Sequence, residues 1–134
     1  MNNQRNETIE NYLEAIHILT LKNNSVRAID IVQYLNYSRP TVSVALKNLQ
    51  SAGYVNIDNN IITLTKLGLS VAEHTYERHE LIAGILIDLG VSKDIAYEDS
   101  CKIEHDLSDE SFKAIKEYYC KIKNAKCSAP QKLD

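Results

Sequence analysis

The 134-residue sequence predicts a mainly α-helical protein with a single β-hairpin, built in two parts. Two observations support this prediction. Apolar residues recur at helical spacing along most of the chain, and the spacing becomes strand-like only over residues 54–64. We expect residues 1–75 to form one domain, residues 76–123 to form a smaller helical domain, and residues 124–134 to be a disordered tail.

Charge and composition limit the classes of function. With 44% hydrophobic and 25% charged residues, the composition is ordinary for a soluble globular protein. The polar start contains no signal peptide and no apolar run approaches the ~20 residues of a membrane span, so we expect a cytoplasmic protein without membrane contact. The net charge of −3 argues against a wholly basic nucleic-acid-binding protein. Residues 25–53 nevertheless hold Arg27, Arg39 and Lys47 against Asp30 alone, which permits DNA binding there.

Residues 7–22 predict an amphipathic helix, because Ile9, Leu13 and Ile16 follow one stripe. Asn11 and Glu14 lie three residues apart on this helix and therefore share a face. Taken alone, such residues are most often exposed to solvent.

Residues 28–53 predict a helix-turn-helix. Residues 28–35 form a short helix with an apolar face, and residues 36–38 make a tight connection. Ser38 suits the N-cap of the next helix, and Pro40 is tolerated in its first turn. Hydroxyl and basic groups at a helix start suit phosphates and base edges. The candidate DNA contacts are Arg27, Ser38, Arg39, Pro40, Thr41, Ser43 and Lys47. The alternative is an ordinary two-helix packing unit with these residues facing outward.

Residues 54–64 predict a β-hairpin with Asp58, Asn59 and Asn60 in its turn. The order of helix, helix, recognition helix and hairpin is that of a winged helix-turn-helix, which favours double-stranded operator DNA as the partner. The hairpin tip has no Lys or Arg, which leaves open a winged helix that serves only protein–protein contact.

The second half predicts a long helix over residues 66–89, a helix over residues 92–107, and a last helix capped by Ser108. The last helix carries a clear apolar stripe that begins at Phe112. Two short helices and the tail of a long one make a thin core. We therefore expect this part to bury its remaining apolar face against a second copy, giving a symmetric homodimer.

Three potential metal ligands stand together on the 92–107 helix. Cys101, Glu104 and His105 lie at positions i, i+3 and i+4, which share one helix face. A thiol, a carboxylate and an imidazole are three metal-ligand types. The alternative is a helix surface with a buried Cys and a Glu–His hydrogen bond. His79, on the long helix, is a ligand only if this face is a metal site.

Taken together, these motifs resemble the iron- and manganese-dependent transcriptional repressors of the DtxR/MntR family. The resemblance covers nearly all of residues 7–123. The segments that carry it are Glu10–Ile16, Ser38–Ser43, Leu64–Gly68, Arg78–Leu81 and Cys101–Ser108. It implies a winged helix-turn-helix followed by a helical dimerisation and metal-binding domain. It also implies a short member, without the third domain of longer iron-type repressors.

The resemblance also implies a ligand set. His79, Glu104 and His105 match ligands of both the iron and the manganese branch. Cys101 matches the thiol of the iron type, and Glu14 matches a carboxylate of the manganese type.

Three positions depart from the pattern of the family. Asn11 stands where the iron type has Met and the manganese type has Asp. Ala83 and Tyr97 stand where the iron type has further Glu and His ligands, so the second site of that branch is not expected in its usual form.

The implied function is metal-dependent repression, in which a divalent ion ties the two domains together and the dimer binds its operator. A thiolate with imidazoles favours Fe²⁺, while the oxygen donors of Glu14 and Asn11 make Mn²⁺ the second choice. Zn²⁺ or Co²⁺ is expected to bind in vitro. Two alternatives stay open: a winged-helix regulator that reads a small molecule without metal, and a metalloenzyme. No general base beside a substrate cleft is recognisable, so an enzyme is not expected.

Overall fold

The computed structural model describes residues 3–123, and the side chains of residues 7–123, in two compact units. The first unit is Met1–His74 and the second is Thr75–Asp134. The tail over residues 124–134, which we predicted to be disordered, lies outside the described residues.

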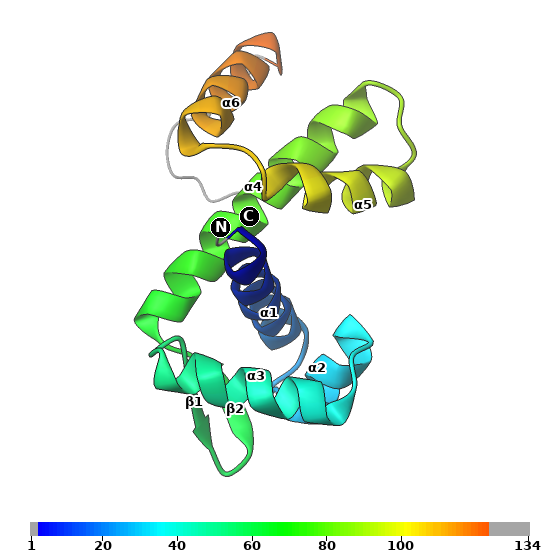
Figure 1. The fold of residues 1–134 in the computed structure, drawn as a ribbon. Helices are drawn as coiled ribbons and strands as arrows, with labels where there is room; N and C mark the ends of the chain where they lie inside the picture. The colour runs from blue at the N-terminus through cyan, green and yellow to red at the C-terminus, as the bar shows by residue number, and fades with distance from the viewer. Residues whose placement is uncertain (1–2, 124–134) are drawn as a thin grey trace. The chain divides into compact units, whose positions relative to one another are not determined.

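The first unit is a winged helix-turn-helix, as predicted. Its elements are α1 (Asn3–Lys22), α2 (Ala28–Leu35), α3 (Arg39–Ser51), β1 (Val55–Asp58), β2 (Ile61–Leu64) and the start of α4 (Lys66–Asp88). Figure 1 shows α2 and α3 joined by a tight turn, with the hairpin directly after α3. Helix α1 begins four residues before the predicted start at residue 7.

The core of this unit follows from the apolar stripes of its helices and the inner face of its hairpin. One side of α1 is buried together with the inner positions of α2, α3 and both strands. The buried members are Tyr12, Leu13, Ile16, Leu19, Val26, Ile31, Val42, Leu46, Leu49, Val55, Ile62 and Ala72. The recognition helix α3 is therefore fixed by its inner face, which leaves its outer face open to solvent.

Local residue chemistry sets the turns of this unit. Asn36 adopts a left-handed conformation at φ 61° and ends α2. The side chain of Ser38 accepts a hydrogen bond from the Thr41 backbone N–H at 3.3 Å, as expected of an N-cap. Asn59 and Asn60, at φ 54° and 65°, form the two-residue hairpin turn. Asp58 belongs to β1 rather than to the turn.

The wing is joined to α4 by a close backbone contact. The Thr65 hydroxyl donates to the backbone carbonyls of Gly53 and Tyr54 and accepts from the Gly68 N–H at 3.1 Å. A Cβ atom at Gly68 would lie 2.0 Å from the Tyr54 carbonyl oxygen. Only glycine therefore allows the first turn of α4 to approach the backbone just before β1 so closely.

Substituting Gly68 should accordingly destabilise the winged helix. We expect Gly68→Ala to lower the free energy of unfolding by about 1–3 kcal/mol or more, the range of overpacked cores. Gly84→Ala is the matched control on the same helix, because its Cβ would meet nothing closer than 3.8 Å. That change should be neutral or stabilise by up to about 1 kcal/mol. Urea unfolding of both variants measures the difference, and equal stabilities would contradict the close contact.

The second unit contains the rest of α4, with α5 (Lys93–Glu104) and α6 (Asp109–Lys123). Among its described residues, the buried apolar side chains are few, namely Ile82, Ala83, Ala96 and Phe112. Large apolar side chains stay exposed on all three helices and in the loop after α4. They are Ile87, Leu89, Ile95, Ile103, Ile115, Tyr118 and Ile122. Such a surface suits burial against a second chain. Within the described residues, no helix is both long and apolar enough to cross a membrane.

Helix α5 ends three residues earlier than the predicted limit at residue 107. Its last residue is Glu104, and His105 is the C-cap. The Arg78 guanidinium donates to the carbonyl oxygens of Glu104 and Leu107, which gives a partner to carbonyl groups at and just after the helix end. Ser108 then caps α6 through a 3.1 Å hydrogen bond from the Ser111 N–H, as predicted.

Candidate metal centre and nucleic-acid interface

Three ligand types converge at the end of α5. One ligand atom each from Cys101, Glu104 and His105 lies within 4.8 Å of the other two. Cys101 and Glu104 belong to the last turn of the helix. His105 keeps helical backbone angles (φ −73°, ψ −18°), so the i, i+3, i+4 spacing still places all three on one side.

The site is buried and polar. The side chains of Glu104 and His105 are 1% and 3% exposed, and Glu104 Oε2 lies 3.5 Å from His105 Nε2. A carboxylate removed from water in this way needs a compensating positive charge. A thiolate, a carboxylate and an imidazole are also a donor set that first-row divalent metals accept. The residues present therefore fit a transition-metal ion.

His79 of α4 belongs to the same region of the second unit. It offers a ligand atom within 4.8 Å of the Glu104 carboxylate. Its Nε2 lies 3.0 Å from the backbone carbonyl oxygen of Tyr97. Because a carbonyl only accepts, Nε2 is the donor in this contact, and Nδ1 is the nitrogen that would coordinate a metal. Metal-binding histidines are usually oriented through their other nitrogen in this way.

Tyr97 contacts His79 through its backbone carbonyl and its ring, and its phenol contacts Glu80. Its phenol donates to Glu80 Oε1 at 2.8 Å, and its ring meets the His79 ring edge-on at 5.5 Å between centroids. Burial and, next, the hydrogen bond to Glu80 raise the pKa of Tyr97 to about 12. The phenol thus stays protonated at neutral pH and acts as a hydrogen-bond donor. Ala83 is buried and has no donor atom.

The two predicted ligands on α1 belong to the first unit. Glu14 is only 6% exposed, which contradicts the expectation that such a residue faces solvent. Glutamate is almost never fully buried unless it is paired, so this burial calls for a cationic or hydrogen-bonding partner. Asn11 is half-buried and lines a pocket of about 900 Å³.

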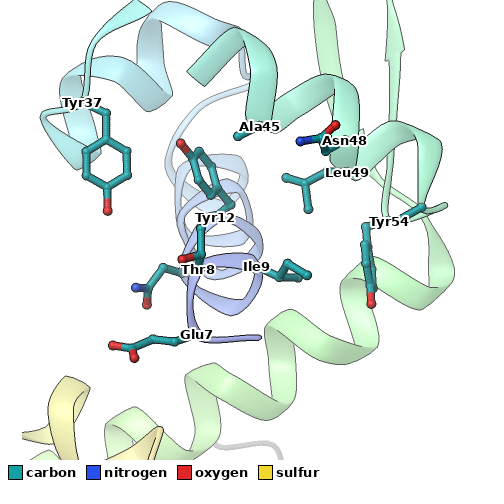
Figure 2. A pocket seen from close by; sticks show the side chains of 11 residues that line it. Glu7, Thr8, Ile9, Tyr12, Tyr37, Ala45, Asn48, Leu49 and Tyr54 are labelled. Carbon is teal, nitrogen blue, oxygen red and sulfur yellow. The ribbon is translucent and has the colours of Figure 1, made fainter. Parts of the chain in front are cut away.

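That pocket lies between α1 and α3 of the first unit. Figure 2 shows Glu7, Thr8, Ile9 and Tyr12 of α1 facing Ala45, Asn48 and Leu49 of α3, with Tyr37 and Tyr54 at its two ends. Tyr12 packs against Tyr37, with 5.9 Å between ring centroids. Burial and the neighbouring Tyr37 raise the pKa of the Tyr12 phenol. The lining is aromatic and largely neutral, without Lys or Arg.

The predicted DNA contacts all lie on exposed positions of the helix-turn-helix. These are Arg27, Ser38, Arg39, Pro40, Thr41, Ser43 and Lys47. Helix α3 carries two basic residues and no acidic residue. The hydroxyl of Ser38 donates to Thr41 Oγ1 at 2.8 Å, so the two groups at the helix start are held together. An exposed, net positive recognition helix suits the phosphate backbone and the major groove.

Sequence reasoning missed the support around these side chains. Arg78 is buried at the end of α5, and Tyr97 holds His79 through its backbone. Both contacts join residues far apart in the chain, and neither residue type signals them locally. The segment Arg78–Leu81 contributed to the family resemblance, but nothing in it indicated that Arg78 contacts the end of α5.

Two known family models match this chain, one over each part. Residues 6–60 match the family model "Iron dependent repressor, N-terminal DNA binding domain". Residues 65–131 match the model "Iron dependent repressor, metal binding and dimerisation domain". The α1 and helix-turn-helix candidates lie in the first match, and the other four candidate ligands lie in the second.

Individual relatives give the same picture. The uncharacterized HTH-type transcriptional regulator MJ0568 of Methanocaldococcus jannaschii is 35% identical over 121 residues, covering 88% of this chain and 97% of that protein. The transcriptional regulator MntR of Salmonella typhimurium is 36% identical over 112 residues, covering 83% and 71%. Among solved structures, the manganese regulator SloR superposes with a TM-score of 0.75 at 26% identity, covering 94% of this chain and 60% of SloR.

Proposed function

Because this chain belongs to the iron-dependent repressor family, the DtxR/MntR family of metal-dependent transcriptional repressors, we propose that its candidate ligands bind Fe²⁺ or Mn²⁺ as the regulatory ion. The observation that carries this proposal is the convergence of Cys101, Glu104 and His105 within 4.8 Å. We assign the ligands to these three residues, to His79 on α4, and to Glu14 from the DNA-binding unit, with the Asn11 amide oxygen beside it.

The metal assignment follows from donor chemistry. The Cys101 thiolate with the imidazoles of His79 and His105 favours Fe²⁺, since sulfur and nitrogen ligands suit the later first-row ions. The oxygens of Glu14 and Asn11 are ligands that Mn²⁺ accepts, and a relative is described as a manganese regulator. We place Fe²⁺ first and Mn²⁺ second. Zn²⁺ and Co²⁺ should bind in vitro, because affinity alone follows the Irving–Williams order.

The proposed mechanism rests on charge. Glu14 and Glu104 bring two carboxylates to the proposed site, and Cys101 adds a third negative group when it gives up its proton to a metal. Three such groups cannot share one site without compensation. A divalent cation held there would supply that compensation. Glu14 would be the ligand from α1 of the DNA-binding unit, and His79, Glu104 and His105 the ligands from the helical unit. Such a link would fix the orientation of each recognition helix in a dimer, as binding to successive major grooves about 34 Å apart requires.

The proposal places the protein with its operator DNA, as a homodimer in the cytoplasm. The family models describe DNA-binding and dimerisation domains, and the exposed apolar surface of α6 supports a dimer. The family consists of transcriptional regulators, so we assign no catalytic residue.

The DNA contacts can be tested through their salt dependence. We expect Arg39→Ala and Lys47→Ala each to weaken operator binding. Each should also make the negative slope of log K, the DNA association constant, against log salt shallower by about 0.9, the value for one lost phosphate contact. Lys113→Ala on α6 is the matched control, since it removes an exposed basic residue from the other unit. Fluorescence anisotropy across a salt series measures the slopes. Unchanged slopes in both α3 variants would remove these residues from the phosphate contacts.

The proposed function is tested by anaerobic titration of the metal-free protein with Fe²⁺, Mn²⁺ or Zn²⁺, read out by mobility shift on DNA from the protein's own promoter. We expect binding to appear with Fe²⁺ and Mn²⁺ and to be lost on adding chelator. Binding that chelator leaves unchanged would instead favour a small-molecule effector, for which the tyrosine-lined pocket of about 900 Å³ is the candidate site.

A further inference from the structure

Arg78 is a buried cation at the centre of the second unit. It is 8% exposed, although arginine is rarely buried without partners. Its NH2 nitrogen donates to the carbonyl oxygen of Glu104 at 2.9 Å and to that of Leu107, and its NH1 nitrogen donates to Asp109 Oδ1 at 3.0 Å. The guanidinium also lies over the Phe112 ring, 5.1 Å from its centroid.

These contacts meet the candidate metal centre at Glu104. Arg78 holds the backbone of Glu104, while the next residue of α4, His79, offers a ligand atom within 4.8 Å of its carboxylate. Two successive residues of α4 therefore act on Glu104: Arg78 holds its backbone, and His79 lies near its side chain. His105 follows directly after the carbonyl that Arg78 holds.

We propose that Arg78 is the positioning residue of the metal centre. Its guanidinium sets the backbone at the end of α5, so that Glu104 and His105 present their donor atoms before any ion arrives. The carbonyls at this end carry the negative end of the helix dipole, which a buried guanidinium complements. Lysine cannot replace it fully, because the planar fork reaches three acceptors at once and an ammonium is a point charge.

The same side chain joins the ligand segment to the helix with the exposed apolar surface. Asp109 and Phe112 belong to the first turn of α6, and both contact Arg78. Arg78 therefore links the 104–107 backbone to α6 in addition to the chain itself, so a shift of that backbone on ion binding would also reach α6 through this side chain. This inference rests on the proposed function, because it assumes an ion held by Cys101, Glu104 and His105.

The test compares variants by anaerobic Co²⁺ titration, with absorbance reporting both affinity and the thiolate–metal band. Arg78→Met should weaken Co²⁺ binding about 10- to 100-fold, the range for lost outer-shell partners, and should alter the spectrum at saturation. Arg78→Lys should recover part of the affinity. Lys116→Met is the matched control, because it breaks another α4–α6 ion pair, with Glu77, that does not touch the ligand segment.

Each outcome decides the question. If Arg78→Met keeps the affinity and spectrum of the wild type, or if Lys116→Met loses as much affinity, Arg78 does not position the ligands. If Arg78→Met fails to fold by circular dichroism, Arg78→Lys decides alone: a wild-type affinity and spectrum would overturn the proposal. Cys101→Ser measured alongside separates the two claims. Unchanged Co²⁺ binding in that variant would mean that the assigned metal site itself is wrong.

Discussion

Cys101→Ala is expected to abolish metal-dependent DNA binding while leaving a folded dimer. Cys101 is the sulfur ligand that we propose beside Glu104 and His105. The alanine side chain has no donor atom that could take its place. Losing a direct ligand should lower metal affinity more than about 100-fold, above the range for lost outer-shell partners. At metal concentrations that saturate the wild type, the variant should then bind operator DNA no better than the wild type does with chelator.

The control for this variant is Lys102→Ala, the next residue of α5, whose side chain is exposed. Mobility shift with and without Fe²⁺ or Mn²⁺, together with sedimentation to confirm the dimer, gives the comparison. A Cys101→Ala protein that still responds fully to metal would remove the thiolate from the site. His79→Ala should show the same loss as Cys101→Ala, since the imidazole offers a ligand atom within 4.8 Å of the Glu104 carboxylate.

Glu14→Gln is expected to separate metal binding from DNA binding. Glutamine keeps the shape of the buried side chain but removes the charge that we propose draws α1 to the ion. Losing this ligand should weaken the site as well, but the ligands of the helical unit are untouched, so the ion should still bind once the metal concentration is raised to saturate the variant. The metal-induced gain in DNA affinity should fall by about 5- to 150-fold, which corresponds to a coupling free energy of 1–3 kcal/mol.

Glu10→Gln is the matched control, because Glu10 lies one helical turn earlier on α1 and is less buried. Metal affinity is measured by competition with a chromophoric chelator, and DNA affinity by anisotropy with and without metal. A Glu14→Gln protein with a wild-type gain in DNA affinity would mean that α1 takes no part in the response.

The first unit could be predicted closely from the sequence because its signals are local. Ser38 caps α3, Asn36 ends α2, and the Asn59–Asn60 turn sets the hairpin. Each is a short-range interaction that can be predicted from the residue type. The inward and outward faces of α3 follow from its apolar period, so the exposure of the candidate DNA contacts could be predicted as well.

The end of α5 could not be predicted in the same way. The spacing of apolar residues continues past Glu104, and no Gly or Pro marks a stop. At this helix end the Glu104 carbonyl accepts from the guanidinium of residue 78, which is 26 positions away in the chain. Propensity is a weak guide wherever a tertiary contact takes the backbone groups of a helix end.

The candidate ligands were only partly predictable from spacing. Cys101, Glu104 and His105 could be grouped because one helix turn brings them together. His79 and Glu14 lie on other helices, so only the resemblance to a family indicated their roles. The burial of Glu14 also ran against its residue type, as polar groups at functional sites often do.

The proposed function requires that the ion and the operator each strengthen the binding of the other. Measuring this effect in both directions is the most direct test. Metal affinity should be measured with and without operator DNA, and DNA affinity with and without metal, on the same protein under anaerobic conditions. We expect operator DNA to tighten metal binding at least about 5-fold. Metal should tighten DNA binding by the same factor. A metal affinity that is identical in the presence and absence of operator would contradict it.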